Sequence, residues 1–99
     1  MGITVRRADD GVHIVIDGKV SIEDAPLLLR SVTDNIEQLT AIHMGEAEAI
    51  DTSVIQILLM ADRVVRKNGR RLCIVEPPDE IVMTFGAAGL SETFGLDYM

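Results

Sequence analysis

The chain has 99 residues and a formal net charge of −7, with 16 acidic and nine basic side chains. That length predicts one domain, and the acidic balance argues against binding to nucleic acid or to anionic lipid. With one cysteine, the chain cannot form an internal disulfide. The sequence has no signal-peptide pattern and no apolar run of membrane-spanning length, so we expect a cytoplasmic protein.

The first part of the chain is typical of a β-hairpin. Residues 3–7 alternate apolar and polar side chains, as a half-buried strand does. The turn signal Asp9-Asp10-Gly11 follows, and a second strand is predicted at 12–16, ending at Asp17-Gly18. The short link between the two strands indicates antiparallel pairing.

A helix is expected next. It should begin close to residues 21–24, because Pro26 is tolerated only near a helix start. The apolar stripe at helical spacing consists of Ala25, Leu28, Leu29, Val32, Ile36 and Leu39. The short apolar run at 41–44 then predicts a central strand.

The second half of the chain alternates helix, strand and helix. A helix is predicted from about Thr52 to Asn68, and its face towards the sheet should hold Val54, Ile57, Leu58, Ala61, Val64 and Val65. Residues 72–75 predict a strand with Cys73 buried in it, and 79–87 predict a third helix. The whole order predicts an α/β fold. Its small mixed sheet should be mostly parallel, with an antiparallel N-terminal hairpin strand and helices packed on it.

The junction before the second helix is the main candidate for a functional site. Asp51, Thr52 and Ser53 stand where that helix begins, and such side chains accept hydrogen bonds from the free N–H groups of a first turn. One interpretation is an ordinary N-cap. The other is a phosphorylation switch, since the dipole at a helix N-terminus favours added negative charge.

Helical geometry indicates which of these side chains another protein could reach. Thr52 should point away from the sheet together with Gln56, whereas Ser53 lies to the side and closer to the core. Ile55 and Leu59 also lie beside Thr52. They either pack against a neighbouring helix or form a docking patch with Thr52 at its edge.

Other candidate chemistry in the sequence is weak. His43, Glu46 and Glu48 lack the spacing of a metal site, and no motif indicates a cofactor. A hydrolase that used a hydroxyl of the junction would need a polar pocket with His13 or His43 near it, and no general base or oxyanion donors can be identified. We therefore expect a protein that is not an enzyme and keep a small Ser/Thr hydrolase as an alternative.

The pattern as a whole resembles the STAS domain family, the sulfate-transporter and anti-sigma-factor-antagonist domains. The motifs that carry the resemblance are Ile16-Asp17-Gly18-Lys19-Val20, Asp24-Ala25, the strand at 41–44, Ile50-Asp51-Thr52-Ser53, Leu58-Leu59, Asn68-Gly69, the strand at 72–75 and Phe85-Gly86-Ala87-Ala88-Gly89-Leu90. The most specific is the Asp-Ser/Thr-Ser junction before an apolar helix. The resemblance implies a single STAS domain over residues 1–99 that acts by binding other proteins.

In the antagonists of this family, a partner kinase of the GHKL type phosphorylates the hydroxyl residue that follows the aspartate, and a 2C-type (PP2C) phosphatase reverses this. The unphosphorylated antagonist captures the kinase, which is also an anti-sigma factor, and so frees the sigma factor. The resemblance thus implies that Thr52 is the phosphoacceptor, ahead of Ser53. It implies a partner-binding surface made of Asp51, Thr52, Ser53, Ile55, Gln56 and Leu59.

Two departures from the family pattern leave alternatives open. Threonine stands at position 52 where serine is usual, and Val54 stands where glycine is usual. Threonine at the acceptor position also occurs in stressosome-type members and in the small STAS subunit of bacterial lipid-transport ABC complexes. The alternatives to an antagonist are therefore an accessory subunit that binds an ABC ATPase and a chemotaxis- or stressosome-type signalling scaffold.

Overall fold

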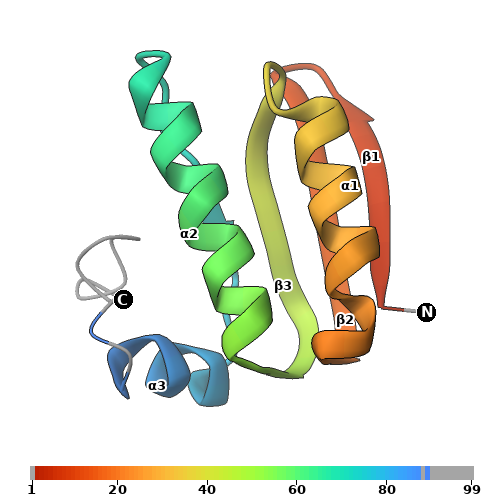
Figure 1. The fold of residues 1–99 in the computed structure, drawn as a ribbon, viewed down its shortest axis with the longest axis vertical. Helices are drawn as coiled ribbons and strands as arrows, with labels where there is room; N and C mark the ends of the chain where they lie inside the picture. The colour runs from red at the N-terminus through yellow and green to blue at the C-terminus, as the bar shows by residue number, and fades with distance from the viewer. Residues whose placement is uncertain (1, 88, 90–99) are drawn as a thin grey trace.

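The computed structural model describes residues 2–87 and 89, which form a four-stranded sheet with helices packed on it (Figure 1). The strands are β1 (Ile3–Ala8), β2 (Gly11–Val20), β3 (Leu39–Ile50) and β4 (Cys73–Val75), and they lie in this order across the sheet. β1 pairs with β2 antiparallel, whereas β2 with β3 and β3 with β4 are parallel. The predicted α/β fold with an antiparallel N-terminal hairpin is confirmed.

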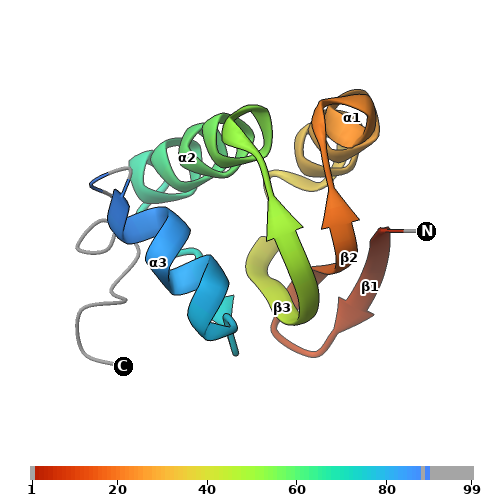
Figure 2. The ribbon, with the colours of Figure 1, turned by 90° about the horizontal axis from the view of Figure 1, so that it is seen from below.

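The helices cover one face of this sheet. They are the short η1 (Ile22–Asp24), α1 (Ala25–Asn35), α2 (Thr52–Lys67) and α3 (Asp79–Ala87). α1 and α2 lie side by side on that face, and α3 packs against β3 (Figure 2). β2 and β3 end, and α1 and α2 begin, at the same end of the molecule, which is at the bottom of Figure 1. No helix within the described residues is long and apolar enough to cross a membrane.

The core between the sheet and the helices is mainly aliphatic. Its fully buried large side chains include Phe85, Ile14, Ile16, Leu28, Leu39, Ile42, Met44, Leu58 and Ile81. Phe85 belongs to the last motif of the family resemblance, of which Ala88 and Leu90 lie outside the described residues. Burial of this set supplies the main favourable term for folding, because each such side chain contributes roughly 1.5–3 kcal/mol.

The two central strands are longer than the sequence predicts, whereas β4 is one residue shorter than the predicted 72–75. β2 continues through Asp17 and Gly18 to Val20, and β3 runs to Ile50 instead of ending near residue 44. The register between β2 and β3 shifts around Asp17 and again after Gly18, whose φ is +66°. An Asp-Gly pair that is a turn signal on its own is here part of a bulged strand, because β3 pairs along its whole length.

The buried face of α2 is also turned relative to the prediction. Ile55 and Asp62 are buried, whereas Ile57 and Val64, which were expected to face the sheet, are half-buried. α2 packs against both α1 and β3, and Ile55 belongs to the same core cluster as Val54 and Leu58, so the buried face of α2 is wider than the predicted stripe. The carboxylate of Asp62 is paired there with Arg66, at 3.0 Å between Oδ2 and Nε.

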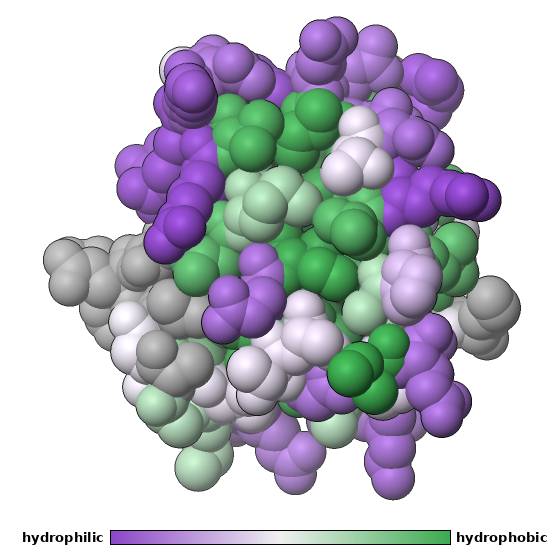
Figure 3. All heavy atoms as spheres, in the orientation of Figure 1, coloured by the Kyte–Doolittle hydropathy of each residue, from purple (hydrophilic) through white to green (hydrophobic). Residues whose placement is uncertain are grey.

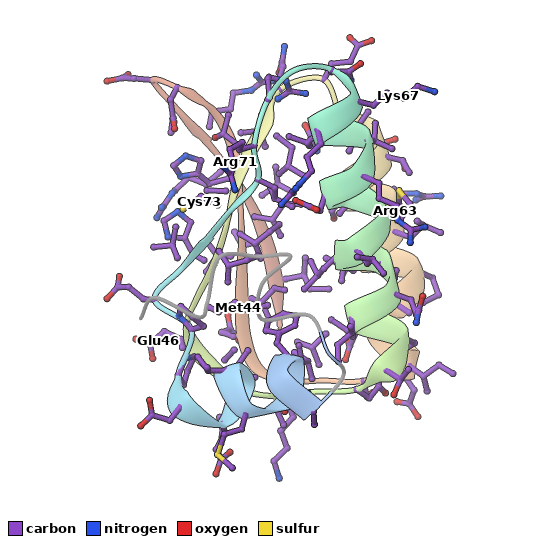
Figure 4. The ribbon with its side chains drawn as sticks, turned by 90° about the vertical axis from the view of Figure 1, so that its left-hand side faces the viewer. Met44, Glu46, Arg63, Lys67, Arg71 and Cys73 are labelled. Carbon is purple, nitrogen blue, oxygen red and sulfur yellow. The ribbon has the colours of Figure 1, made fainter. Side chains whose placement is uncertain are left out.

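Three further side chains lie elsewhere than predicted. Leu39 belongs to β3 instead of the α1 stripe, and Leu29 is 43% exposed on α1. Cys73, expected to be buried, is exposed on β4 (Figure 4). Its neighbour Ile74 is buried, and side chains alternate along a strand, so Cys73 faces the side of the sheet that α1 and α2 leave uncovered.

Arg70, which follows α2, contacts the link between α1 and β3, which is distant from it in sequence. Its guanidinium donates hydrogen bonds to the backbone oxygens of Leu39 and Ile36, both at 2.8 Å, and so fixes the link between α1 and β3. Because hydrogen bonds from a charged donor are strong, Arg70→Ala is expected to lower the free energy of unfolding by about 1.5–3 kcal/mol. Urea denaturation measures this. The exposed neighbour is the control: Arg71→Ala should change it by less than about 0.5 kcal/mol, and equal losses would contradict the assignment.

Candidate functional site

Asp51 caps the first turn of α2. Its backbone is extended (φ −104°, ψ 179°), and its carboxylate accepts hydrogen bonds from the backbone N–H groups of Ser53 and Val54 at 3.1 and 3.4 Å. The hydroxyl of Ser53 donates to the same oxygen at 2.5 Å. The N-cap predicted from the sequence is therefore present, and it engages Ser53 through both its backbone and its side chain.

The Asp51 carboxylate also connects α2 to η1. The hydrogen bond from the Ser53 side chain is the main cause that holds the pKa of Asp51 below its ordinary value. Burial is the next-largest influence and raises that pKa, while the backbone N–H groups of Val54, Ile22 and Ser53 lower it further. Ile22 begins η1, which has a capping box of its own between Ser21 and Asp24. One ionised carboxylate thus orders both turns at this end of the molecule.

Asp51→Asn is expected to lower the midpoint temperature of unfolding at neutral pH, because the amide loses the charge that these donors stabilise. The lowered pKa means that Asp51 stabilises the fold above pH 3.8, its ordinary value, and that this contribution is lost as the pH falls through the lower folded-state value. Thermal unfolding from pH 6 to pH 2 is the measurement. The gap between wild type and Asp51→Asn should narrow in acid, and a constant gap would contradict the assignment.

Thr52 and Ser53 differ in how far another molecule can reach them. Thr52 is the first residue of α2, and its side chain is exposed, on the side of the helix that the sequence predicts. Ser53 is half-buried, with its hydroxyl directed to Asp51. Of the two hydroxyl residues, Thr52 is the one presented to solvent.

The other predicted docking residues divide into two groups. Gln56 is exposed and Leu59 is half-buried, so both present surface near Thr52. Ile55 is only 5% exposed and belongs to the core cluster. Of the two interpretations of Ile55, packing inside the protein is therefore the one that fits, and Ile55 holds α2 against the core.

An apolar residue that the sequence analysis did not single out lies beside this site. Ile22 is 68% exposed, and the backbone hydrogen bond to Asp51 places its turn next to the start of α2. Leu29, on α1, is exposed as well. Figure 3 shows apolar side chains gathered over the layer of α1 and α2. An isoleucine just before a helix is an ordinary feature of a sequence, so no local signal distinguished Ile22.

The histidines lie away from this site. His13 and His43 face the side of the sheet opposite α1 and α2, and they are hydrogen-bonded to each other at 2.9 Å. His43 lies seven residues before the end of β3, and seven residues of strand span about 23 Å. The hydrolase alternative requires a histidine beside Thr52 or Ser53. The structure places neither His13 nor His43 there. The described residues also hold no group of three or more potential ligands that could bind a metal ion.

Comparison with solved structures gives the fold independently. The chain is similar to the unphosphorylated form of the anti-sigma factor antagonist SpoIIAA, with a TM-score of 0.72, 16% identity, and coverage of 86% of this chain and 82% of that one. The phosphorylated form of SpoIIAA from Bacillus gives a TM-score of 0.73 at 16% identity, covering 92% and 86%. A Thermotoga maritima protein provisionally assigned as an anti-sigma factor antagonist gives 0.80 at 17% identity, covering 91% and 80%. At these identities, the likeness concerns the fold.

Sequence comparison identifies the family. No curated protein sequence is significantly similar to this chain. The STAS domain model, in contrast, matches residues 3–98, which is nearly the whole chain, and the SpoIIAA-like structure agrees with that match. The chain therefore belongs to the STAS domain family.

Proposed function

We propose that residues 1–99 act as a single STAS domain in the cytoplasm, as a non-enzymatic, antagonist-like regulator that binds a GHKL-type kinase serving as an anti-sigma factor. Phosphorylation of Thr52 by that kinase gates the binding, and a PP2C-type phosphatase resets it. The observation that carries the proposal is the contrast at the start of α2. The Thr52 side chain is exposed, whereas the Ser53 hydroxyl is bound to Asp51.

The docking surface in this proposal surrounds the N-terminal end of α2. Thr52, Gln56 and Leu59 present side chains there, and Asp51 and Ser53 fix the backbone that carries them. Ile22 adds apolar surface at the edge, and such surface favours contact with a protein partner. The proposal assigns Ile55 a supporting role beneath this surface.

A phosphate on Thr52 works in this proposal by adding charge where a partner packs. It carries about −1.5 to −2 charges at neutral pH. The neighbouring carboxylate of Asp51 is ionised, and Glu23 and Glu48 are exposed on the adjoining η1 and β3. The local electrostatic potential is therefore already negative. The phosphate acts in this proposal mainly by repelling a docked partner, and not by changing the conformation of the chain.

The direct test is phosphorylation of the purified chain by GHKL-type kinases encoded beside its gene, with ATP and site mapping by mass spectrometry. We expect one phosphate on Thr52, its loss in Thr52→Ala and its retention in Ser53→Ala. Phosphate on Ser53, or none on the chain, would remove the switch. If the chain instead captures an ABC ATPase and binding is indifferent to Thr52→Glu, the accessory-subunit alternative replaces the proposal.

A further inference from the structure

A cluster of four polar side chains lies on the face of the sheet opposite α1 and α2. Val12 and Ile14 on β2 are buried beneath the helices, so His13 between them points to the opposite face. His13 aligns with Ala41 on β3, two residues before His43, and the two imidazole centroids are 4.8 Å apart. Arg6, His13, His43 and Asp10 make up this histidine cluster.

Three contacts join the histidine cluster into one row. The Oδ1 atom of Asp10 lies 2.9 Å from Nε2 of His13, and Nδ1 of His13 lies 2.9 Å from Nε2 of His43. The Nη2 atom of Arg6 lies 3.3 Å from the same Nε2 of His43. The row runs from the hairpin turn through β2 to β3 and back to β1, so it links the outer strand to the centre of the sheet.

The partners at each end decide where the hydrogens lie. Arginine is only a donor, so Nε2 of His43 must present its lone pair to Arg6. The hydrogen between the two rings then belongs to Nδ1 of His13, and the one lone pair of His43 Nε2 is shared between this donor at 2.9 Å and Arg6 at 3.3 Å. An ionised carboxylate only accepts, so Nε2 of His13 also carries a hydrogen, towards Asp10. The row is complete when His13 is doubly protonated and charged, and His43 is neutral with its hydrogen on Nδ1.

Any other proton count breaks a contact. Without the added proton, His13 carries one hydrogen. On Nε2, that hydrogen leaves Nδ1 to meet either a lone pair of His43 or an Nε2–H that faces the donor Arg6; on Nδ1, it leaves a lone pair facing the carboxylate of Asp10. With a second proton on His43, two N–H groups face each other between the rings, and a third positive charge joins those of Arg6 and His13. The arrangement therefore fits one added proton and excludes two.

We propose that the histidine cluster is an acid-sensitive latch, which holds one proton on His13 and releases the outer strand β1 from β3 when a second proton binds His43. Arg6 is the only member of the cluster on β1, and β1 pairs with β2 alone in the sheet. Loss of the contact between Arg6 and His43 therefore leaves the hairpin held by its own ladder. The effect of acid is local loosening of β1, not unfolding of the core.

The charged surroundings agree with this order of protonation. Burial is the main cause that lowers the pKa of His43, and the positive charges of His13 and Arg6 lower that pKa further, while Glu76 and Asp10 oppose them. Glu46 lines the same shallow hollow as His43 and Glu76, and Cys73 on β4 lies on the same face of the sheet. The second proton thus enters only below the pH at which an ordinary histidine titrates.

Long-range ¹H–¹⁵N NMR of the intact chain, titrated from pH 8 to pH 4, tests the latch. In the state with one added proton, we expect His43 to keep a hydrogen on Nδ1 and an unprotonated Nε2. Protonation of His43 should then coincide with faster amide exchange in β1 than in β3, after correction for intrinsic rates. A hydrogen on Nε2 of His43 in the state with one added proton, or protonation of His43 without any change in β1, would overturn the proposal.

Matched variants separate the cluster from general charge effects. His13→Gln and Arg6→Gln should each raise the pH at which His43 protonates, because each removes a positive charge that faces it. Arg7→Gln is the control, since Arg7 points to Gln38 at 3.4 Å and not to the cluster. Arg6 and Arg7 are both exposed, so neither substitution should endanger the fold. An unchanged titration of His43 in both His13→Gln and Arg6→Gln would overturn the latch.

The latch also predicts a pH dependence of stability with a defined sign. The pKa of His43 is lower in the folded chain than the ordinary value of 6.5, so unfolding takes up a proton between the two values. The stabilising contribution of neutral His43 is therefore full above pH 6.5 and is lost as the pH falls towards the folded-state value. In His43→Gln, the decline in midpoint temperature just below pH 6.5 should be shallower than in wild type, and an unchanged decline would contradict the assignment.

Discussion

Thr52→Glu is expected to weaken binding of the GHKL-type kinase by roughly 30- to 150-fold, which corresponds to about 2–3 kcal/mol. The substitution places a carboxylate at the first position of α2, beside Asp51, on the proposed docking surface. A charge that is desolvated in an interface without a partner costs several kcal/mol. Thr52→Ala should bind as wild type does and should not be phosphorylated.

The control for Thr52→Glu adds the same charge elsewhere on the same layer. Thr33 is also an exposed threonine, and it lies towards the C-terminal end of α1, far from the start of α2 (Figure 1). Thr33→Glu should leave the dissociation constant within about twofold of wild type, since charges at the rim or outside an interface contribute little. Titration calorimetry measures all three variants. Equal loss in Thr52→Glu and Thr33→Glu would show a general charge effect and refute the site.

Gly11→Ala is expected to lower the free energy of unfolding by about 3–5 kcal/mol, since both backbone strain and a steric clash arise. Gly11 has φ of +141°, and a Cβ atom there would lie 2.3 Å from the backbone oxygen of Gln38. That oxygen accepts a hydrogen bond from Val12 at 2.7 Å, at the start of the alignment of β2 with β3. Backbone cannot move aside as a flexible side chain can, so the clash would disturb the alignment itself.

Gly69→Ala is the matched control for Gly11→Ala. Gly69 follows the C-cap of α2 with φ of +79°, but a Cβ atom there would meet nothing within 4 Å. Its substitution should therefore show only the conformational cost, about 1–2 kcal/mol. Urea denaturation of both variants compares the two. A loss in Gly11→Ala no larger than that in Gly69→Ala would show that the close approach to Gln38 does not matter.

Local chemistry in the sequence was sufficient to predict the ends of α2. Asp51 accepts the first free N–H groups, and Asn68 with Gly69 ends the helix, through interactions within a few residues of each other. The hairpin at Asp9 and Asp10 was predictable for the same reason. Because α2 has fixed ends, the helical angle then placed the Thr52 side chain outward, and the structure agrees. The role of Thr52 as a phosphoacceptor stays a prediction.

The sequence did not predict which of these side chains are buried, or which side chains from distant segments contact each other. The burial of Ile55 and Asp62 depends on how α2 packs within the whole fold, and Cys73 is exposed because β4 is an outer strand with one face uncovered. His13 and His43 gave no signal as separate residues, and only the alignment of β2 with β3 brings their rings into contact.

The amino-acid sequence by itself determined the caps of α2, the hairpin turn at Asp9 and Asp10, and the order of strands and helices, since those depend on side chains next to the backbone that they bind. Only the tertiary structure decided which face of each helix is buried, how far β2 and β3 extend, and which side chains from β1, β2 and β3 meet. These features depend on contacts between residues that are about 30 or more positions apart, and such contacts form only when the sheet and its helices pack together.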